Sequence, residues 1–267
     1  MIIDFHTHCY PASLASVAIS RRWKDRKYHA DGTAEGLLTD LRYSGADRAV
    51  VLHVARKPTT MYDVNDFAAK LQRRYPDRLR CFGSVHPDSP EAIEELHRIK
   101  ELGLCGIKLH PSFQLFEPTR RRYFPLYEEM GRLGLPVLFH CGCYTADAPH
   151  LQPRELEQIL PYFGSTPVIG AHLGGLWNNV THDNLEQLSI LESLPIYVDT
   201  GFCVNSFSDA EVYEVLSRLK PERVLYGSDT PWIDARMQME QLRRMRLDDA
   251  RMERILYRNA SELLHWE

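Results

Sequence analysis

Residues 135–172 read LPVLFHCGCYTADAPHLQPRELEQILPYFGSTPVIGAH and contain one strand–helix–strand unit. Two apolar runs, Leu135–His140 and Thr166–His172, enclose an amphipathic stretch, Pro153–Tyr162, that opens on a proline. Both runs are apolar at successive positions, as in parallel strands that are buried on both faces. The segment is therefore predicted to form two parallel strands joined by a helix.

The same alternation continues in both directions along the chain. The other apolar runs expected to form strands are Ile2–His6, Ala49–Val54, Leu79–Val85, Cys105–Leu109, Pro195–Thr200 and Arg223–Ser228. The other stretches expected to form helices are Thr33–Ser44, Pro90–Leu102, Arg121–Leu133, Asn184–Leu191, Asp209–Leu219 and Asp248–Leu264. Eight strands in 267 residues are typical of one (β/α)8 barrel, also called a TIM barrel. We therefore predict a single α/β domain over residues 1–267.

A doubly wound open sheet is the alternative architecture for such a pattern. That fold usually carries a glycine-rich phosphate turn after its first strand, whereas residues 7–11 of this chain read THCYP. The connection over residues 9–32 is long for a barrel loop and includes the basic stretch RRWKDRK at residues 21–27. Long loops are commonly lids or binding loops, so we expect one here; a solvated basic surface segment is the alternative.

The composition favours a globular protein that acts on a small molecule. The chain is 44% hydrophobic and carries a formal net charge of -4, which disfavours nucleic acid or an anionic membrane as the main partner. No apolar run approaches the roughly 20 residues of a membrane helix. The N-terminus has no signal-peptide pattern, and the six cysteines show no disulfide spacing. We predict a cytoplasmic protein, and nothing in the composition excludes a homodimer.

Imidazoles and one carboxylate follow the predicted strands at their carboxyl ends. In a TIM barrel these ends meet at one rim, where the active site lies. His6 and His8 are two residues apart in a strand, so both can face the same way and bind one ion. With His140 and Asp229 they make a ligand set that suits one divalent metal, Zn²⁺ first, with Mn²⁺ or Fe²⁺ as alternatives.

Five motifs make the chain resemble the amidohydrolase superfamily, in its amidohydrolase 2 branch of metal-dependent hydrolases and decarboxylases. They are DFHTH at 4–8, GIKLHP at 106–111, LFH at 138–140, GAHLGG at 170–175 and YGSDTPW at 226–232. They occur in the order of that family and span essentially the whole chain. The resemblance implies that His6, His8, His140 and Asp229 are metal ligands. It implies that His172 is the acid–base residue.

The predicted reaction is hydrolysis of a small amide, ester or lactone, with a carboxylate on the substrate. A divalent metal supplies hydroxide near neutral pH. His172 can remove and return a proton, and Asp229 can orient the nucleophile. The alternative within the enzyme class is non-oxidative decarboxylation of an aromatic or unsaturated carboxylic acid. The alternative from another class is a metal-holding barrel that only binds a ligand, which an incomplete ligand set would favour.

Further side chains are predicted to contact the substrate, with packing under the loops as the alternative. They are Lys108, His110, His86, Trp177 and Trp232. Lys108 shares the inward face of its strand with His110. Two states are open for it: a free ammonium that binds the substrate carboxylate, or a carbamate that bridges two metals, as in the binuclear branch of the superfamily. We expect the ammonium and one metal. Asp199, at the end of the seventh predicted strand, is expected to support a ligand.

Overall fold

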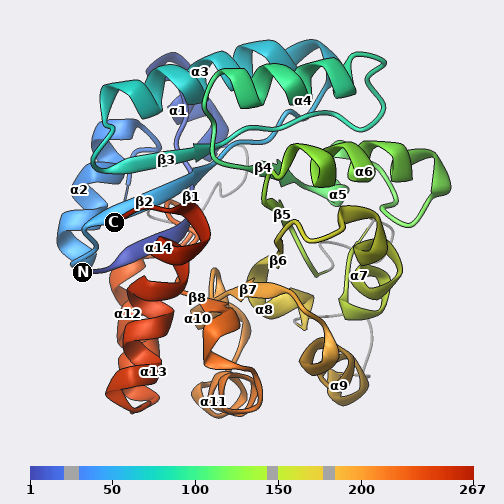
Figure 1. Ribbon diagram of the computed structural model, residues 1–267. Helices are drawn as coiled ribbons and strands as arrows, with labels where there is room; N and C mark the ends of the chain where they lie inside the picture. The colour runs from blue at the N-terminus through green and yellow to red at the C-terminus, as the bar shows by residue number, and fades with distance from the viewer. Residues whose placement is uncertain (21–29, 143–149, 177–183) are drawn as a thin grey trace.

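The computed structural model describes residues 1–20, 30–142, 150–176 and 184–267. Within this part of the chain, parallel strands alternate with helices (Figure 1). The strands are β1 (Ile3–Thr7), β2 (Arg48–Leu52), β3 (Leu79–Phe82), β4 (Ile107–Leu109), β5 (Val137–Phe139), β6 (Val168–Gly170), β7 (Tyr197–Asp199) and β8 (Val224–Leu225). Each lies inside or within one residue of a run that the sequence predicted.

Hydrogen bonds close the strands into a barrel. Strands β1–β3 form one continuous sheet and β4–β8 another, all parallel. A bridge between Gly83 and Ile107 joins β3 to β4, and a bridge between Thr7 and Thr230 joins β1 to the segment after β8. The predicted single-domain TIM barrel is therefore confirmed.

The helices surround the strands in Figure 1. The α-helices are α1 (Ala12–Ser20), α2 (Ala34–Ser44), α3 (Met61–Arg74), α4 (Ala92–Glu101), α5 (Pro111–Gln114), α6 (Phe124–Leu133), α7 (Pro153–Ile159), α8 (Ala171–Gly175), α9 (Asn184–Ser193), α10 (Cys203–Ser206), α11 (Asp209–Arg218), α12 (Ala235–Arg244), α13 (Asp249–Glu253) and α14 (Asn259–Leu264). Short 3-10 turns are η1 (Pro58–Thr60), η2 (Arg121–Tyr123), η3 (Leu160–Phe163) and η4 (Pro221–Arg223), and η5 (Arg254–Arg258) is a π-helix between α13 and α14.

Local sequence explains where several helices begin and end. The Thr33 side chain accepts a hydrogen bond from the Gly36 backbone at the start of α2, and Gly45 ends that helix in the left-handed conformation. Ser208 and Glu211 form a capping box on α11. Helices α1, α3 and α12 were not predicted from the sequence, and neither were the short helices α5, α8 and α10. Helix α1 occupies part of the long connection after β1; residues 21–29 of the expected lid lie outside the described residues.

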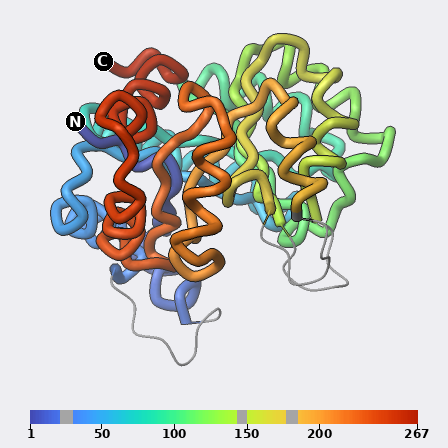
Figure 2. Tube along the Cα trace, turned by 90° about the horizontal axis from the view of Figure 1, so that it is seen from below, coloured from blue at the N-terminus to red at the C-terminus, as the bar shows by residue number. Residues whose placement is uncertain are grey.

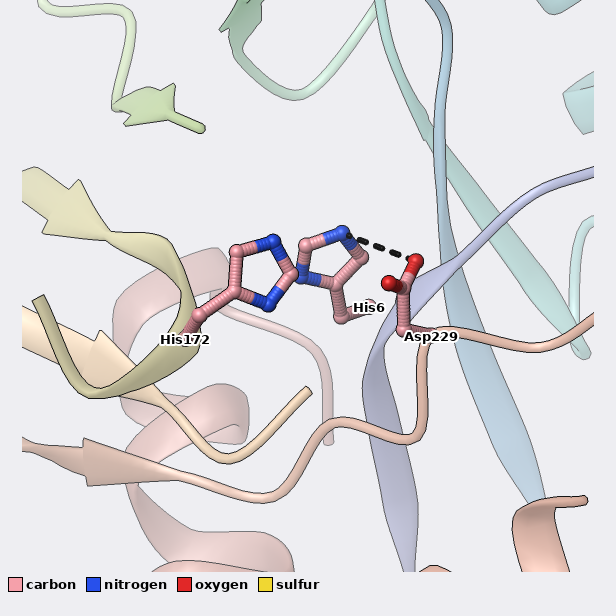
Figure 3. Close-up of side chains that lie close together, drawn as sticks. All are labelled: His6, His172 and Asp229. Carbon is pink, nitrogen blue, oxygen red and sulfur yellow. Dashed lines mark ion pairs between the residues drawn. The ribbon is translucent and has the colours of Figure 1, made fainter. Parts of the chain in front are cut away.

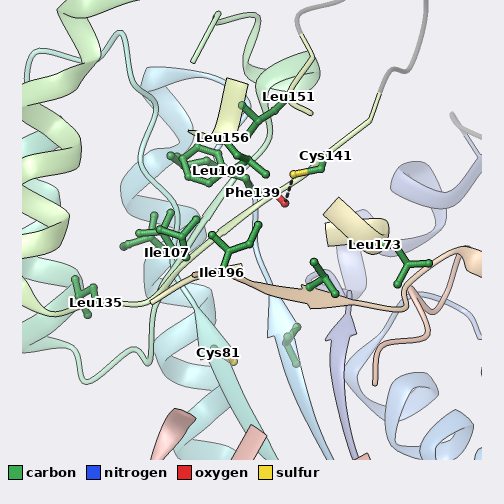
Figure 4. Close-up of a cluster of buried hydrophobic side chains, with 14 of the residues drawn as sticks. Cys81, Ile107, Leu109, Leu135, Phe139, Cys141, Leu151, Leu156, Leu173 and Ile196 are labelled. Atoms are coloured by element: carbon green, nitrogen blue, oxygen red, sulfur yellow. Dashed lines mark hydrogen bonds between the residues drawn. The ribbon is translucent and has the colours of Figure 1, made fainter. Parts of the chain in front are cut away.

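Two apolar clusters hold the barrel together. The larger one lies between strands and helices, and Figure 4 shows part of it, including Leu109, Phe139 and Leu156. The smaller one contains strand side chains of the opposite parity, such as Phe5 and Leu138, together with residues of the C-terminal segment. Both termini lie close together at one end of the molecule (Figure 2). In the described residues, no helix is long and apolar enough to cross a membrane.

Candidate metal centre

A bulge in β1 turns His6 and His8 into the barrel. The register between β1 and β2 shifts between Asp4 and Thr7. Before this shift Phe5 packs in the smaller, interior cluster, so strict alternation would point His6 and His8 outward. A bulge inserts one extra residue and re-aims the side chains that follow it. Both imidazoles therefore face the interior, and His6 is buried.

The Nδ1 atom of each imidazole is held by an acceptor. His6 Nδ1 lies 2.8 Å from Oδ2 of Asp199. His8 Nδ1 lies 2.8 Å from the carbonyl oxygen of Leu52. A carbonyl oxygen can only accept, so the proton of neutral His8 is on Nδ1 and its Nε2 carries a lone pair. Acceptors behind ligating histidines fix the tautomer in this way at metal sites.

Asp229 approaches the two imidazoles from the segment after β8. Its backbone N–H donates to the carbonyl of His6 at 2.8 Å, and its φ of 70° is in the left-handed region. Residues other than glycine adopt this conformation infrequently, although Asp does so more readily than most, and it is found at functional sites. Oδ1 of Asp229 lies 3.0 Å from Nε2 of His8 and 3.5 Å from Nε2 of His6.

His172 completes the cluster from the end of β6. It lies in a left-handed turn, with a φ of 58°. Its Nδ1 is 2.8 Å from the carbonyl oxygen of Gly201, and its ring centroid is 4.9 Å from that of His6. Figure 3 shows His6, His172 and Asp229 together, with the ion pair between His6 and Asp229 dashed.

His140 lies behind His172. Its Nδ1 is 3.0 Å from Nε2 of His172. The His140 ring stacks on the His110 ring, with a centroid distance of 3.8 Å and an interplanar angle of 11°. His110 in turn stacks on Phe113, and the Arg56 guanidinium lies over the Phe113 ring. A column of planar groups thus leads from the cluster to an exposed arginine.

The donor set fits a divalent cation. Ligand atoms of His6, His172 and Asp229 all lie within 4.8 Å of one another. With Nδ1 of His8 protonated toward Leu52, its Nε2 lone pair faces a carboxylate oxygen only 3.0 Å away. These two atoms repel each other unless a proton or a metal cation lies between them, and the imidazole and carboxylate donors are those that Zn²⁺, Mn²⁺ and Fe²⁺ accept.

Burial favours the neutral forms of the His6 and His172 imidazoles, and the nearby imidazoles favour the charged forms of the Asp199 and Asp229 carboxylates. Burial lowers the pKa of His172 to about 4, and it also lowers the pKa of His6. Burial alone would raise the pKa of Asp199, but the neighbouring His6 outweighs it and holds this pKa at about 2. The pKa of Asp229 is lowered in the same way, because His6 and His8 outweigh its burial. These are the ionisation states that metal ligands need.

Two of the predicted substrate residues, Lys108 and Trp232, lie near the cluster. Lys108 is buried, and its charge adds to burial in lowering the pKa of His6 and of His172, so its amine lies near the cluster. Trp232 is a neighbour of His8, with ring centroids 6.4 Å apart.

The other two predicted substrate residues are His86 and Trp177. Nδ1 of His86 accepts a hydrogen bond from the Asp88 backbone at 3.3 Å. Within the described part of the chain, no hydrogen bond joins His86 to the cluster. Trp177 lies outside the described residues.

His53, which follows β2 directly, was not among the residues predicted from the sequence. Its side chain is buried, and its pKa is lowered to about 3 by burial and by the neighbouring His8. The rule that singled out histidines at strand ends would have found it. Two other elements carried no signal: the backbone carbonyls of Leu52 and Gly201 that orient His8 and His172.

Comparison with known families assigns the chain to a class. The amidohydrolase family described by the Amidohydro_2 model matches residues 3–266. The chain therefore belongs to the amidohydrolase 2 family, as its motifs predicted. A search among curated proteins finds no sequence match.

Solved structures confirm the barrel. An uncharacterised TIM-barrel protein from Bordetella bronchiseptica superposes with a TM-score of 0.80 at 20% identity, over 99% of this chain and 98% of that one. A putative 2-pyrone-4,6-dicarboxylic acid hydrolase from Pseudomonas putida gives 0.74 at 20% identity, over 100% and 98%. A dihydroxybenzoic acid decarboxylase from Polaromonas with bound manganese and 2-nitroresorcinol gives 0.75 at 15% identity, over 99% and 96%.

Proposed function

We propose that this protein is a metal-dependent hydrolase of a small, carboxylate-bearing amide, ester or lactone. His6, His8, His140 and Asp229 would hold one divalent ion, with Zn²⁺ as first candidate and Mn²⁺ or Fe²⁺ as alternatives. The observation that carries the proposal is the short separation of His8 Nε2 from Asp229 Oδ1, 3.0 Å, with the other nitrogen of His8 committed to Leu52. When bound, such an ion supplies a hydroxide nucleophile near neutral pH and polarises a carbonyl oxygen.

His172 is the proton-transfer residue in this proposal. Its Nδ1 is committed to the carbonyl of Gly201, so Nε2 is the atom that can take up and release a proton. Burial keeps the imidazole neutral at physiological pH, and a neutral imidazole is able to act as a base. Nε2 lies 3.0 Å from Nδ1 of His140; in this proposal it gives up that contact, removes a proton from the nucleophile and returns it to the leaving group.

Lys108 is the substrate-binding cation in this proposal. It is buried beside the cluster, where a compact ammonium can bind a carboxylate of the substrate. A carboxylate is the ligand that best offsets the cost of a buried positive charge. This role favours a substrate with a carboxyl group over a neutral amide or ester.

A second candidate reaction is non-oxidative decarboxylation of an aromatic or unsaturated acid. The specific observation in its favour is the likeness to the manganese-containing dihydroxybenzoic acid decarboxylase, whereas the putative dicarboxylic acid hydrolase favours the first candidate. The same residues would serve both: Lys108 binds a carboxylate, and His172 delivers a proton, here to the carbon that loses CO₂.

One screen separates the two reactions. Lactones, amides and esters that carry a carboxylate, and hydroxylated benzoic acids, would be incubated with the protein loaded with Zn²⁺ or Mn²⁺. Proton release and CO₂ release are followed together. Hydrolysis of an ester or lactone releases a proton without CO₂, and hydrolysis of an amide releases an amine without CO₂; one of these is the expected result. CO₂ evolved from an aromatic or enoic acid, with no hydrolysis of any lactone, amide or ester, would replace the first candidate by the second.

A further inference from the structure

A single buried carboxylate connects the two sides of the candidate site. Asp199 ends β7 and has no exposed surface. Its Oδ2 contacts the His6 imidazole of β1, and its Oδ1 accepts hydrogen bonds from the backbone N–H groups of His172 and Gly201 at 3.1 and 2.8 Å. Both carboxylate oxygens are therefore used, one on each side of the cluster.

The Oδ2 side determines the tautomer of His6. The ionised carboxylate can only accept, so the proton of a neutral His6 is on Nδ1, and Nε2 carries the lone pair that faces Asp229. The acceptors behind His8 and His172 are backbone carbonyls, which a side-chain substitution does not remove. His6 is held by a side chain instead, so its tautomer can be changed by mutation.

The Oδ1 side holds the backbone around His172. The left-handed conformation of His172 is costly for a histidine and needs surrounding contacts to persist. Oδ1 binds the N–H of His172, and it also binds the N–H of Gly201, whose carbonyl accepts from His172 Nδ1. The space is tight: a Cβ at Gly201 would lie 2.9 Å from Oδ1 and 3.0 Å from His6 Nδ1.

We propose that Asp199 is a positioning residue that sets the tautomer of His6 for metal binding and fixes the orientation of His172 for proton transfer. The inference rests on the proposed function, because metal binding and proton transfer are the roles that it assigns to this arrangement. The arrangement itself can be tested without metal or substrate. Asp199 touches neither the substrate nor the ion in this account; it acts through His6 and His172.

The substitution Asp199→Asn tests the tautomer directly. The two backbone N–H groups of His172 and Gly201 need an acceptor, so the amide oxygen of asparagine will face them. The amide nitrogen then faces His6 and donates to Nδ1. That arrangement moves the His6 proton to Nε2, the atom that should bind the metal. An asparagine in place of the carboxylate behind a catalytic histidine imposes a wrong tautomer in the same way.

The readout is the ¹⁵N spectrum of the imidazoles in metal-free protein, with the His6 signals assigned by their absence from His6→Gln. We expect Nδ1–H in the unsubstituted protein and Nε2–H in Asp199→Asn. The Zn²⁺ affinity, measured by competition with a chromophoric chelator, should fall about 10- to 100-fold, the usual effect of losing a partner of a metal-bound histidine. Glu95→Gln is the matched control, because Glu95 is equally buried but bonds Asn65 and Arg98. It should leave both readouts unchanged.

The outcomes separate this inference from the proposed function. An Nδ1–H tautomer and unchanged Zn²⁺ affinity in Asp199→Asn would overturn the inference. If that variant does not fold, the unsubstituted protein still decides, because an Nε2–H tautomer of His6 there contradicts the inference by itself. Failure of the unsubstituted protein to bind Zn²⁺ would refute the proposed function, while the tautomer of His6 would remain a valid test of the role of Asp199.

Discussion

Nε2 of His172 lies 3.0 Å from Nδ1 of His140, so one proton is shared between the two imidazoles. His172 donates its own Nδ1–H to Gly201, and its Nε2 is therefore the acceptor in this pair when it is neutral. If His140 binds the metal through Nε2, then Nε2 of His172, the atom proposed to exchange a proton, lies next to a metal ligand. His172 also lies within ligand distance of His6 and Asp229, so its role needs a direct test.

The substitution His172→Asn should separate the two roles of that residue. If His172 is the acid–base residue and not a ligand, the variant should retain most of the metal. Its rate should fall about 10²- to 10⁴-fold, the usual contribution of general acid–base catalysis. Metal content and kcat are measured on the same preparation, with the partly exposed His97→Asn as control. Loss of the metal from the His172 variant would make His172 a ligand and our assignment wrong.

Asp229→Asn should impair metal binding and rate together. The substitution removes the negative charge that faces Nε2 of His8 and of His6, and a neutral amide is a much weaker ligand for a divalent cation. Isothermal titration with Zn²⁺ and steady-state kinetics provide the two readouts. As a control, Asp209→Asn replaces a carboxylate that forms a surface ion pair with Arg244, and it should change neither the Zn²⁺ affinity nor the rate. Full metal affinity in the Asp229 variant would remove this residue from the ligand set.

Lys108→Met should raise KM for a carboxylate-bearing substrate more than it lowers kcat. A charged hydrogen bond contributes about 1.5–3 kcal/mol, which corresponds to a 10- to 100-fold change in kcat/KM. We further expect one metal per chain and an intact mass for unmodified lysine. Two metals, bridged by a carbamate visible at Lys108 in an electron-density map, would contradict this account and move His172 into the ligand set.

Protonation of His53 should destabilise the metal-free protein at low pH. Burial lowers its pKa from 6.5 to about 3 in the folded state. The unfolded chain therefore binds more protons, and the stability that is present above pH 6.5 is lost as the pH falls toward 3, by up to about 1.4 kcal/mol per pH unit. Denaturant unfolding of His53→Phe should show a flatter slope across this range. Phe67→Leu, which removes a ring contact of His53 without removing a titrating group, should keep the original slope.

Much of the fold could be predicted because each strand is marked by its own apolar run. Leu135–His140 contains β5 and Thr166–His172 contains β6, and glycines such as Gly45 and Gly134 end helices where the sequence placed them. Helices α3 and α12 were not predicted, and they have clear amphipathic faces in the structure. Most strands are shorter than their runs because residues at one or both ends of a run, such as Cys105 and His140, lie outside the strand.

The site was less predictable because its geometry depends on the backbone. Because side chains alternate along a strand, His6 and His8 were predicted to lie on the same face, and they do. Only the bulge after Asp4 turns that face toward the interior of the barrel. No residue type in the sequence indicates a bulge there. The left-handed conformations of His172 and Asp229 are likewise uncommon for any residue other than glycine, although Asp and His adopt them more often than most.

The metal content of the purified protein tests the central claim most directly. Protein prepared without chelator would be analysed for transition metals, and then again after dialysis against a chelator and reloading with Zn²⁺ or Mn²⁺. The account predicts about one ion per chain, removable by the chelator and restored by either cation. The absence of metal in the purified protein, together with no uptake of Zn²⁺ or Mn²⁺, would contradict it.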